Sequence, residues 1–135
     1  MSRRQYGALP FRVHDGKLQV MLITSRETKR WIVPKGWPHG TQRQTARTEA
    51  YEESGVRGKI HRKPLGSFTY KKRLPDRKRV LVALKVFPLA VKRQLKKWPE
   101  KKQRKTRWFS IEEAAKRCSE PALGELMRKL SARVK

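Results

Sequence analysis

Hydrophobic residues fall into short runs separated by polar turns, and these runs predict a chain built mainly from β-strands. We expect strands over residues 6–13, 18–24, 31–33, 59–70, 80–87 and 106–109, with a bend or bulge at Gly66 in the fourth. The fifth of them ends before Pro88, since proline interrupts a strand.

Helical patterns occur in the middle and at the end of the chain. Residues 41–54 predict a helix with Thr41 as its N-cap and Gly55 as its stop, and residues 110–113 begin a second helix in a capping-box pattern. A third helix opens at Glu120-Pro121. Strands mixed with one crossing helix and terminal helices predict an α+β fold, an α/β/α sandwich around a mixed sheet.

The length of 135 residues predicts a single domain over residues 1–135, with residues 1–5 as a disordered basic tip. The one cysteine, Cys118, excludes a disulfide framework within the chain. Residues 1–9 lack the apolar core of a signal peptide, and residues 80–91 are too short and interrupted to span a bilayer. We therefore expect a cytoplasmic protein, monomeric or homodimeric, with no membrane partner.

The charge of the chain indicates which partners it binds rather than which fold it adopts. The chain has 36 Lys and Arg against 11 Asp and Glu, a formal net charge of +25. Such a surface attracts phosphate-rich polyanions, either a polyanionic phosphorylated small molecule or nucleic acid. Nine of the sixteen residues in 92–107 are basic, with Glu100 as the one acid, which fits either a solvated loop or a polyanion contact.

Acidic residues are scarce, yet Glu49, Glu52 and Glu53 fall within five positions. At about 100° per residue they share one arc of the predicted helix, where their mutual repulsion is unfavourable. A solvated helix face would place Lys or Arg four residues later, but position 56 is Val and Arg57 follows the helix stop. A hard divalent cation would neutralise this repulsion and make the three carboxylates a metal-binding site. Spacing alone leaves open both a solvated helix face and a metal site.

The segment Glu-Ala-Tyr-Glu-Glu-Ser-Gly-Val at 49–56 resembles the second half of the Nudix box. Its flanks, Thr-Ser-Arg at 24–26, Trp-Ile-Val-Pro-Lys-Gly at 31–36 and Trp-Phe at 108–109, resemble the Nudix branch acting on diphosphoinositol polyphosphates and dinucleoside polyphosphates. The resemblance covers roughly residues 6 to 130 and implies a Nudix fold.

The chain departs from the Nudix box at its start. The separation of 13 positions between Gly36 and Glu49 is two shorter than in the family, and no acid replaces the first Glu of the box. Thr48 stands where the family has an arginine that orients the carboxylates, and Arg47 points along a different face of the helix.

The resemblance implies a Nudix-type pyrophosphohydrolase that uses Mg²⁺, or Mn²⁺, to cleave a phosphoanhydride bond. It assigns the metal to the Gly36 carbonyl with Glu49, Glu52 and Glu53, and the general base to Glu49 or Glu52. Resemblance and charge together give five phosphate-binding residues: Arg26, Lys35, Lys71, Lys72 and Arg79. The alternative is a basic nucleic-acid-binding module, or an RNA 5′-pyrophosphohydrolase, on a partly degenerate Nudix scaffold.

Overall fold

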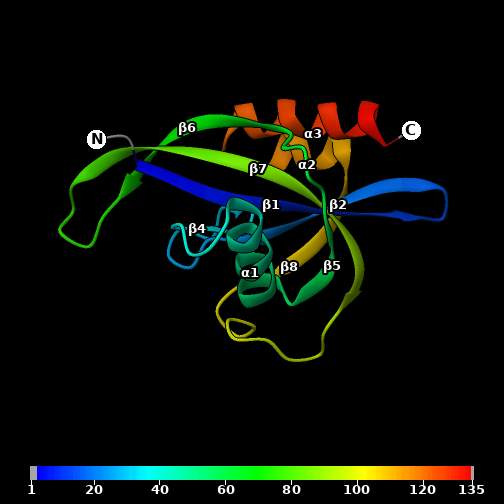
Figure 1. The fold of residues 1–135 in the computed structure, drawn as a ribbon, viewed down its shortest axis with the longest axis horizontal. Helices are drawn as coiled ribbons and strands as arrows, with labels where there is room; N and C mark the ends of the chain where they lie inside the picture. The colour runs from blue at the N-terminus through cyan, green and yellow to red at the C-terminus, as the bar shows by residue number, and fades with distance from the viewer. Residues whose placement is uncertain (1–2, 135) are drawn as a thin grey trace.

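The computed structural model describes residues 3–134 as one mixed sheet flanked by helices (Figure 1). Strands β1 (Arg3–His14), β2 (Lys17–Thr24), β3 (Trp31–Ile32), β7 (Arg79–Gln94) and β5 (Val56–Ile60) are arranged in the order β3-β2-β1-β7-β5. Beside this path, β4 (Lys35–Gly36) pairs with β1, β6 (Gly66–Arg73) with β7, and β8 (Thr106–Ser110) with β2. Only β1 and β7 run parallel within the described part.

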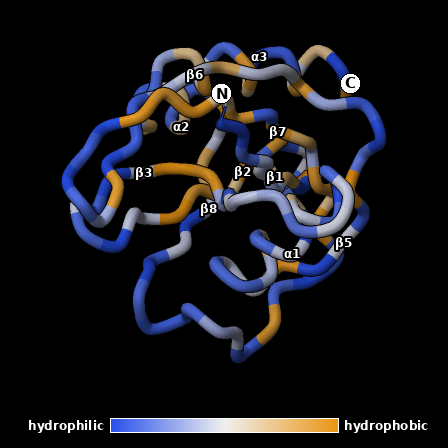
Figure 2. Tube along the Cα trace, turned by 60° about the vertical axis from the view of Figure 1, so that its left-hand side comes forward, coloured by the Kyte–Doolittle hydropathy of each residue, from blue (hydrophilic) through white to orange (hydrophobic). Residues whose placement is uncertain are grey.

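Side chains of the sheet alternate between two apolar layers. Leu9 and Phe11 pack with residues of α2 (Ile111–Arg117) and α3 (Pro121–Arg133), whereas Ala8 packs against α1 (Gln42–Ser54) through Ala46. Alternation with period two sends neighbouring residues to opposite faces. The predicted α+β sandwich is therefore confirmed, and Figure 2 shows the hydrophobic residues along the central strands and the hydrophilic residues in the outer loops.

The prediction of one strand over residues 59–70 is wrong. Residues 59–60 end β5, residues 66–70 begin β6, and these two strands pair with successive parts of the long strand β7. The amides of His61 and Leu65 donate to the carbonyls of Pro88 and Val86 where β5 and β6 meet. Pro88 thus pairs through its carbonyl where the partner of β7 changes from β5 to β6, and β7 continues through it although the sequence predicted a strand that stops at Phe87.

The chain start also differs from the expectation. The predicted disordered tip included residues 3–5, but these form the beginning of β1 and pair with residues 82–84 of β7. The long β7 supplies a parallel partner that the sequence pattern does not reveal. Residues 1–2 of the predicted tip lie outside the described residues.

Helix α1 begins and ends as predicted. Thr41 accepts a hydrogen bond from the Gln44 amide (3.2 Å), the Gln44 side chain accepts one from the Thr41 amide (2.8 Å), and Gly55 adopts a left-handed φ of 75°. The small side chains of Ala46 and Ala50 let the helix lie close to the sheet. No helix of residues 3–134 is long and apolar enough to cross a membrane.

Candidate active site

The three clustered glutamates lie in the last turns of α1. Glu53 is buried, with 4% of its surface exposed, while Glu49 and Glu52 are partly exposed. Gly36 lies opposite in β4, which pairs with β1. A Cβ at Gly36 would come within 2.7 Å of Glu49 Cγ, so the glycine leaves the space in which the Glu49 side chain lies.

His39 contacts this cluster from the shortened entry loop. Its Nε2 lies 2.9 Å from Glu49 Oε2, and 47% of its side chain is exposed. The loop is fixed to α1 because the His39 amide donates to Thr45 Oγ1 and that hydroxyl donates to the His39 carbonyl (2.9 and 2.8 Å). The two-residue-shorter loop therefore closes onto the helix beside Glu49.

Arg104 reaches the cluster from the basic segment between β7 and β8. Its Nη2 lies 3.8 Å from Glu53 Oε1, its Nε lies 2.9 Å from Glu100 Oε1, and its side chain is 9% exposed. Sequence reasoning missed both Arg104 and Glu100 as site residues. The available signal was Glu100 itself, the one acid in a run of basic residues.

Burial raises the pKa values of two of these carboxylates, Glu53 and Glu52. Burial raises the pKa of Glu53 to about 8, although the charge of Arg104 opposes the shift. Burial, and next the charge of Glu49, raises the pKa of Glu52. Within residues 3–134 no three His, Cys, Asp or Glu side chains are already arranged as a metal cluster.

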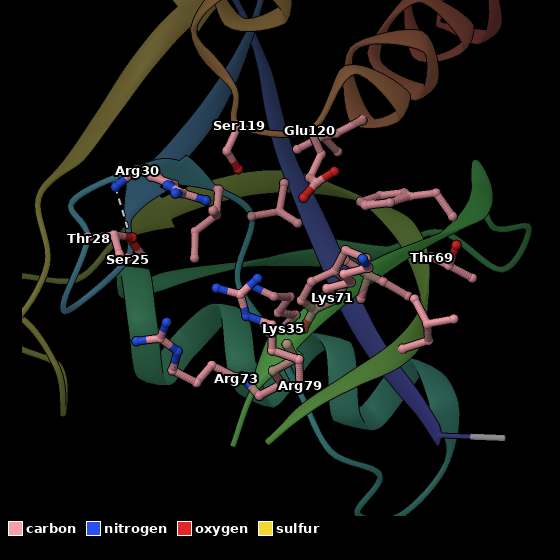
Figure 3. Close-up of a pocket in the computed structure, with 18 of the residues that line it drawn as sticks. Ser25, Thr28, Arg30, Lys35, Thr69, Lys71, Arg73, Arg79, Ser119 and Glu120 are labelled. Atoms are coloured by element: carbon pink, nitrogen blue, oxygen red, sulfur yellow. Dashed lines mark hydrogen bonds between the residues drawn. The ribbon is translucent and has the colours of Figure 1, made fainter. Parts of the chain in front are cut away.

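A cavity of about 750 Å³ lies between the β6–β7 hairpin and the start of α3 (Figure 3), and none of the three clustered glutamates lines it. Lys35, next to Gly36 in the chain, lines this cavity and also lies close enough to Glu53 for their charges to interact. Burial lowers the pKa of Lys35 to about 8, and the charge of Glu53 opposes that change. Tyr70 and Glu120 lie in other parts of the wall.

Basic residues are gathered along this cavity. They are Arg30, Lys35, Lys71, Lys72, Arg73 and Arg79. Four of the five residues predicted to bind phosphate are thus brought together, while Arg30 and Arg73 are additions that the prediction lacked. The fifth, Arg26, does not line the cavity; it is exposed, and its Nη1 donates to Gln103 Oε1 (3.3 Å).

The donors of the acidic cluster fit a hard divalent cation. They are carboxylate oxygens and the main-chain carbonyl of Gly36, and Mg²⁺ and Mn²⁺ prefer oxygen ligands of this kind. Because Gly36 has no side chain, its backbone lies directly next to the Glu49 side chain. His39 contacts Glu49, and Arg104 faces Glu53, where its positive charge offsets part of the carboxylate charge.

The sheet, the carboxylates at the end of α1 and the basic cavity together define a Nudix-type hydrolase domain. The family model described as the NUDIX domain matches residues 1–130, so the chain belongs to the Nudix hydrolases, a family of pyrophosphohydrolases. Members of this family typically depend on a divalent metal ion and act on phosphorylated small molecules.

Named relatives agree with this family. The chain is 35% identical to diphosphoinositol polyphosphate phosphohydrolase 3-alpha of Mus musculus, covering 95% of this chain and 77% of the relative. It is also 35% identical to the mitochondrial Nudix hydrolase 16 of Arabidopsis thaliana, covering 89% and 74%. It spans only 59% of the length of the Arabidopsis relative Nudix hydrolase 4.

The fold is that of a solved Nudix structure. The crystal structure of the C. elegans Ap4A hydrolase superposes with a TM-score of 0.71 over the whole of both chains, at 24% identity.

Proposed function

We propose that this Nudix hydrolase cleaves a phosphoanhydride bond in a substrate that carries several phosphates, such as a diphosphoinositol polyphosphate or a dinucleoside polyphosphate. The observation that carries the proposal is a cavity lined by six basic side chains, one of which, Lys35, is next to Gly36 in the chain and close enough to Glu53 of α1 for their charges to interact. The acidic cluster and the basic cavity together match a substrate in which one phosphate reacts and the basic side chains hold further phosphates.

Residues of the acidic cluster would hold the metal. The proposed ligands are Glu49, Glu52, Glu53 and the Gly36 carbonyl, with Mg²⁺ as the first candidate and Mn²⁺ as the second. When bound, a divalent cation polarises phosphoryl oxygens and lowers the pKa of a bound water. Glu53 suits a ligand role rather than a general base, because it is buried and faces Arg104.

Proton abstraction from water is assigned to Glu49 or Glu52. Both are more exposed than Glu53, so a water molecule can reach them. Glu49 lies 2.9 Å from His39, which would hold its carboxylate in one orientation. The attacked phosphorus then loses another phosphate as the leaving group, and no covalent intermediate with the protein is needed.

The remaining phosphates would be held by the cavity. Lys35 lines the cavity and is close enough to Glu53 for their charges to interact, so its ammonium group would contact a phosphate near the scissile bond. Lys71, Lys72 and Arg79 line the hairpin side and would hold phosphates farther away. Arg26 lies outside this wall and would contact only a substrate that extends beyond the cavity.

The names of relatives support this class of substrate. The mouse relative is named as a diphosphoinositol polyphosphate phosphohydrolase, and the C. elegans structure as an Ap4A hydrolase. Both names describe molecules with several phosphates. The resemblance at residues 24–36 and the basic cavity point in the same direction.

The test is phosphate release over a panel of substrates with Mg²⁺ or Mn²⁺. The panel contains diadenosine polyphosphates, an inositol pyrophosphate, inorganic polyphosphate and 5′-triphosphorylated RNA. We expect turnover on one of the small molecules, its loss in Glu53→Gln, and its retention in Glu112→Gln, which removes an exposed acid of α2. Metal-dependent turnover on RNA alone would favour the 5′-pyrophosphohydrolase, whereas RNA binding without turnover would leave a binding module.

A further inference from the structure

The segment at residues 95–105 contacts the end of α1 through some of its residues, while its lysines are exposed. It caps the C-terminal end of α1, where the Leu95 amide donates to the Gly55 carbonyl (2.8 Å) and the Glu100 amide to the Glu52 carbonyl (2.9 Å). Carbonyls at a helix end otherwise lack partners. The Trp98 ring packs on Gly55 so closely that a Cβ there would collide with it. The segment is thus attached to the helix turn that carries the glutamates.

Arg104 uses each of its guanidinium nitrogens on a different partner. Nε pairs with Glu100 (2.9 Å), Nη1 donates to the Thr24 carbonyl at the end of β2 (3.2 Å), and Nη2 faces Glu53 (3.8 Å). The amide of Lys105 donates to Thr24 Oγ1 (2.9 Å), which fixes the backbone beside it. The bonds to Glu100 and Thr24 hold the planar group in place, with its Nη2 facing Glu53.

No other Lys or Arg among residues 3–134 forms an ion pair with the cluster of Glu49, Glu52 and Glu53. The arginines of α1, Arg43 and Arg47, form none. Burying a charged carboxylate without a nearby cation is costly, and the Arg104 guanidinium that faces Glu53 offsets part of this cost.

We propose that Arg104 is the positioning residue of the metal site, holding Glu53 in its ligand orientation from outside α1. It would take the role of the orienting arginine that the family has at the position of Thr48. The proposal rests on the assignment of Glu53 as a metal ligand under the proposed function. Glu100 acts with Arg104, because it fixes the guanidinium from the opposite side.

The test is direct Mn²⁺ binding, measured by the loss of the free Mn²⁺ electron paramagnetic resonance signal at a temperature well below unfolding. Three variants are compared with the wild-type chain. Arg104→Met keeps an apolar side chain and loses the guanidinium group. Arg104→Lys keeps the positive charge without the planar guanidinium, and Lys102→Met removes an exposed charge from the same segment.

We expect Arg104→Met to weaken Mn²⁺ binding by about tenfold or more, as removal of a group that orients a ligand does. Arg104→Lys should weaken it by about threefold, because one ammonium group cannot meet three partners, and Lys102→Met should change it by less than about twofold. At saturating metal, the loss in the Arg104 variants should fall on kcat more than on KM.

A folded Arg104→Met or Arg104→Lys variant that binds Mn²⁺ as tightly as the wild-type chain would overturn the proposal. The same holds if the wild-type chain does not bind Mn²⁺, or if Lys102→Met loses as much affinity as Arg104→Met. Thermal unfolding with EDTA separates a purely structural role, which would lower the Tm and leave the affinity of the folded protein unchanged. Because Mn²⁺ binding is measured without substrate, unchanged affinity in the Arg104 variants would overturn the role of Arg104 while turnover on the substrate panel still tests the proposed function.

Discussion

Gly36 is the residue at which the smallest change would disturb the candidate site. We expect Gly36→Ala to displace the Glu49 side chain, since the new Cβ would come within 2.7 Å of Glu49 Cγ. Displacement of about 1 Å costs on the order of 100-fold in rate, so kcat/KM should fall by about this factor while the Tm changes little. Steady-state kinetics and thermal unfolding measure the two quantities.

The matched control is Gly124→Ala in α3, another buried glycine, where a Cβ would meet the Cβ of Ala115 at 3.3 Å. It should keep its activity per folded molecule. Wild-type activity in Gly36→Ala would show that Glu49 has no role at this position.

Glu53 gives the metal-free protein a specific dependence of stability on pH. Its pKa is raised from 4.5 to about 8 by burial, so folding favours the protonated carboxyl group. The cost of Glu53 to folding is absent below pH 4.5 and grows as the pH rises towards about 8. We therefore expect Glu53→Gln, measured in EDTA, to gain Tm relative to wild type between pH 5 and pH 8.

The difference between variant and wild type reports Glu53 together with its effect on Lys35, whose pKa burial lowers and the charge of Glu53 raises. Glu125→Gln, an exposed site on α3, is the control and should show no such trend. A Tm difference between Glu53→Gln and wild type that stays constant with pH would contradict the account.

At the scale of elements, α1 was predictable because its signals are local. The N-cap Thr41, the stop at Gly55 and the three glutamates all lie within one short stretch of the chain. Strands β5 and β6 were not separated correctly, because their boundary depends on how each pairs with β7. The same applies to Pro88, whose place in a strand becomes acceptable only when its partner strands are known.

The β6–β7 hairpin is the element expected to hold the distal phosphates. Lys72→Met and Arg79→Met should each raise KM by about fivefold with little change in kcat, because a charge-assisted contact made equally in ground and transition states is lost. The increase should shrink at high salt, which screens the charges of the wild-type chain.

Lys78→Met is the control for the hairpin, because Lys78 lies in the exposed turn outside the cavity lining. Equal effects of all three variants on KM would show that the overall charge of the hairpin matters and not its contacts within the cavity.

The segment at residues 95–105 should depend on Trp98 for its attachment to α1. We expect Trp98→Ala to destabilise the protein by about 2–3 kcal/mol through loss of the ring that packs on Gly55. Hydrogen exchange at the amides of Leu95 and Glu100 should become faster, since both bond to the end of α1.

Trp37→Ala is the control for Trp98→Ala, because Trp37 is 40% exposed in the entry loop. It should change stability by much less and leave exchange at Leu95 and Glu100 unaltered. Unchanged exchange in Trp98→Ala would mean that the segment is held in another way.

At the scale of the whole molecule, the net charge of +25 is organised rather than uniform. Part of it lines the cavity, and Arg104 is buried against acidic residues. The sequence predicted that basic residues would meet phosphate, but the partnership of Arg104 with Glu53 joins residues 51 positions apart and depends on the folded path of the chain. Spacing along a helix gives no information about such a contact.

The central claim is that the carboxylates of α1 support metal-dependent cleavage of a phosphoanhydride bond. Its most direct test is phosphate release against Mg²⁺ concentration, on the best small-molecule substrate, for wild type and Glu52→Gln. We predict a wild-type rate that rises from zero and saturates with Mg²⁺, and a rate at least about 100-fold lower in a folded Glu52→Gln. Turnover without a divalent metal, or equal turnover in Glu52→Gln, would contradict the account.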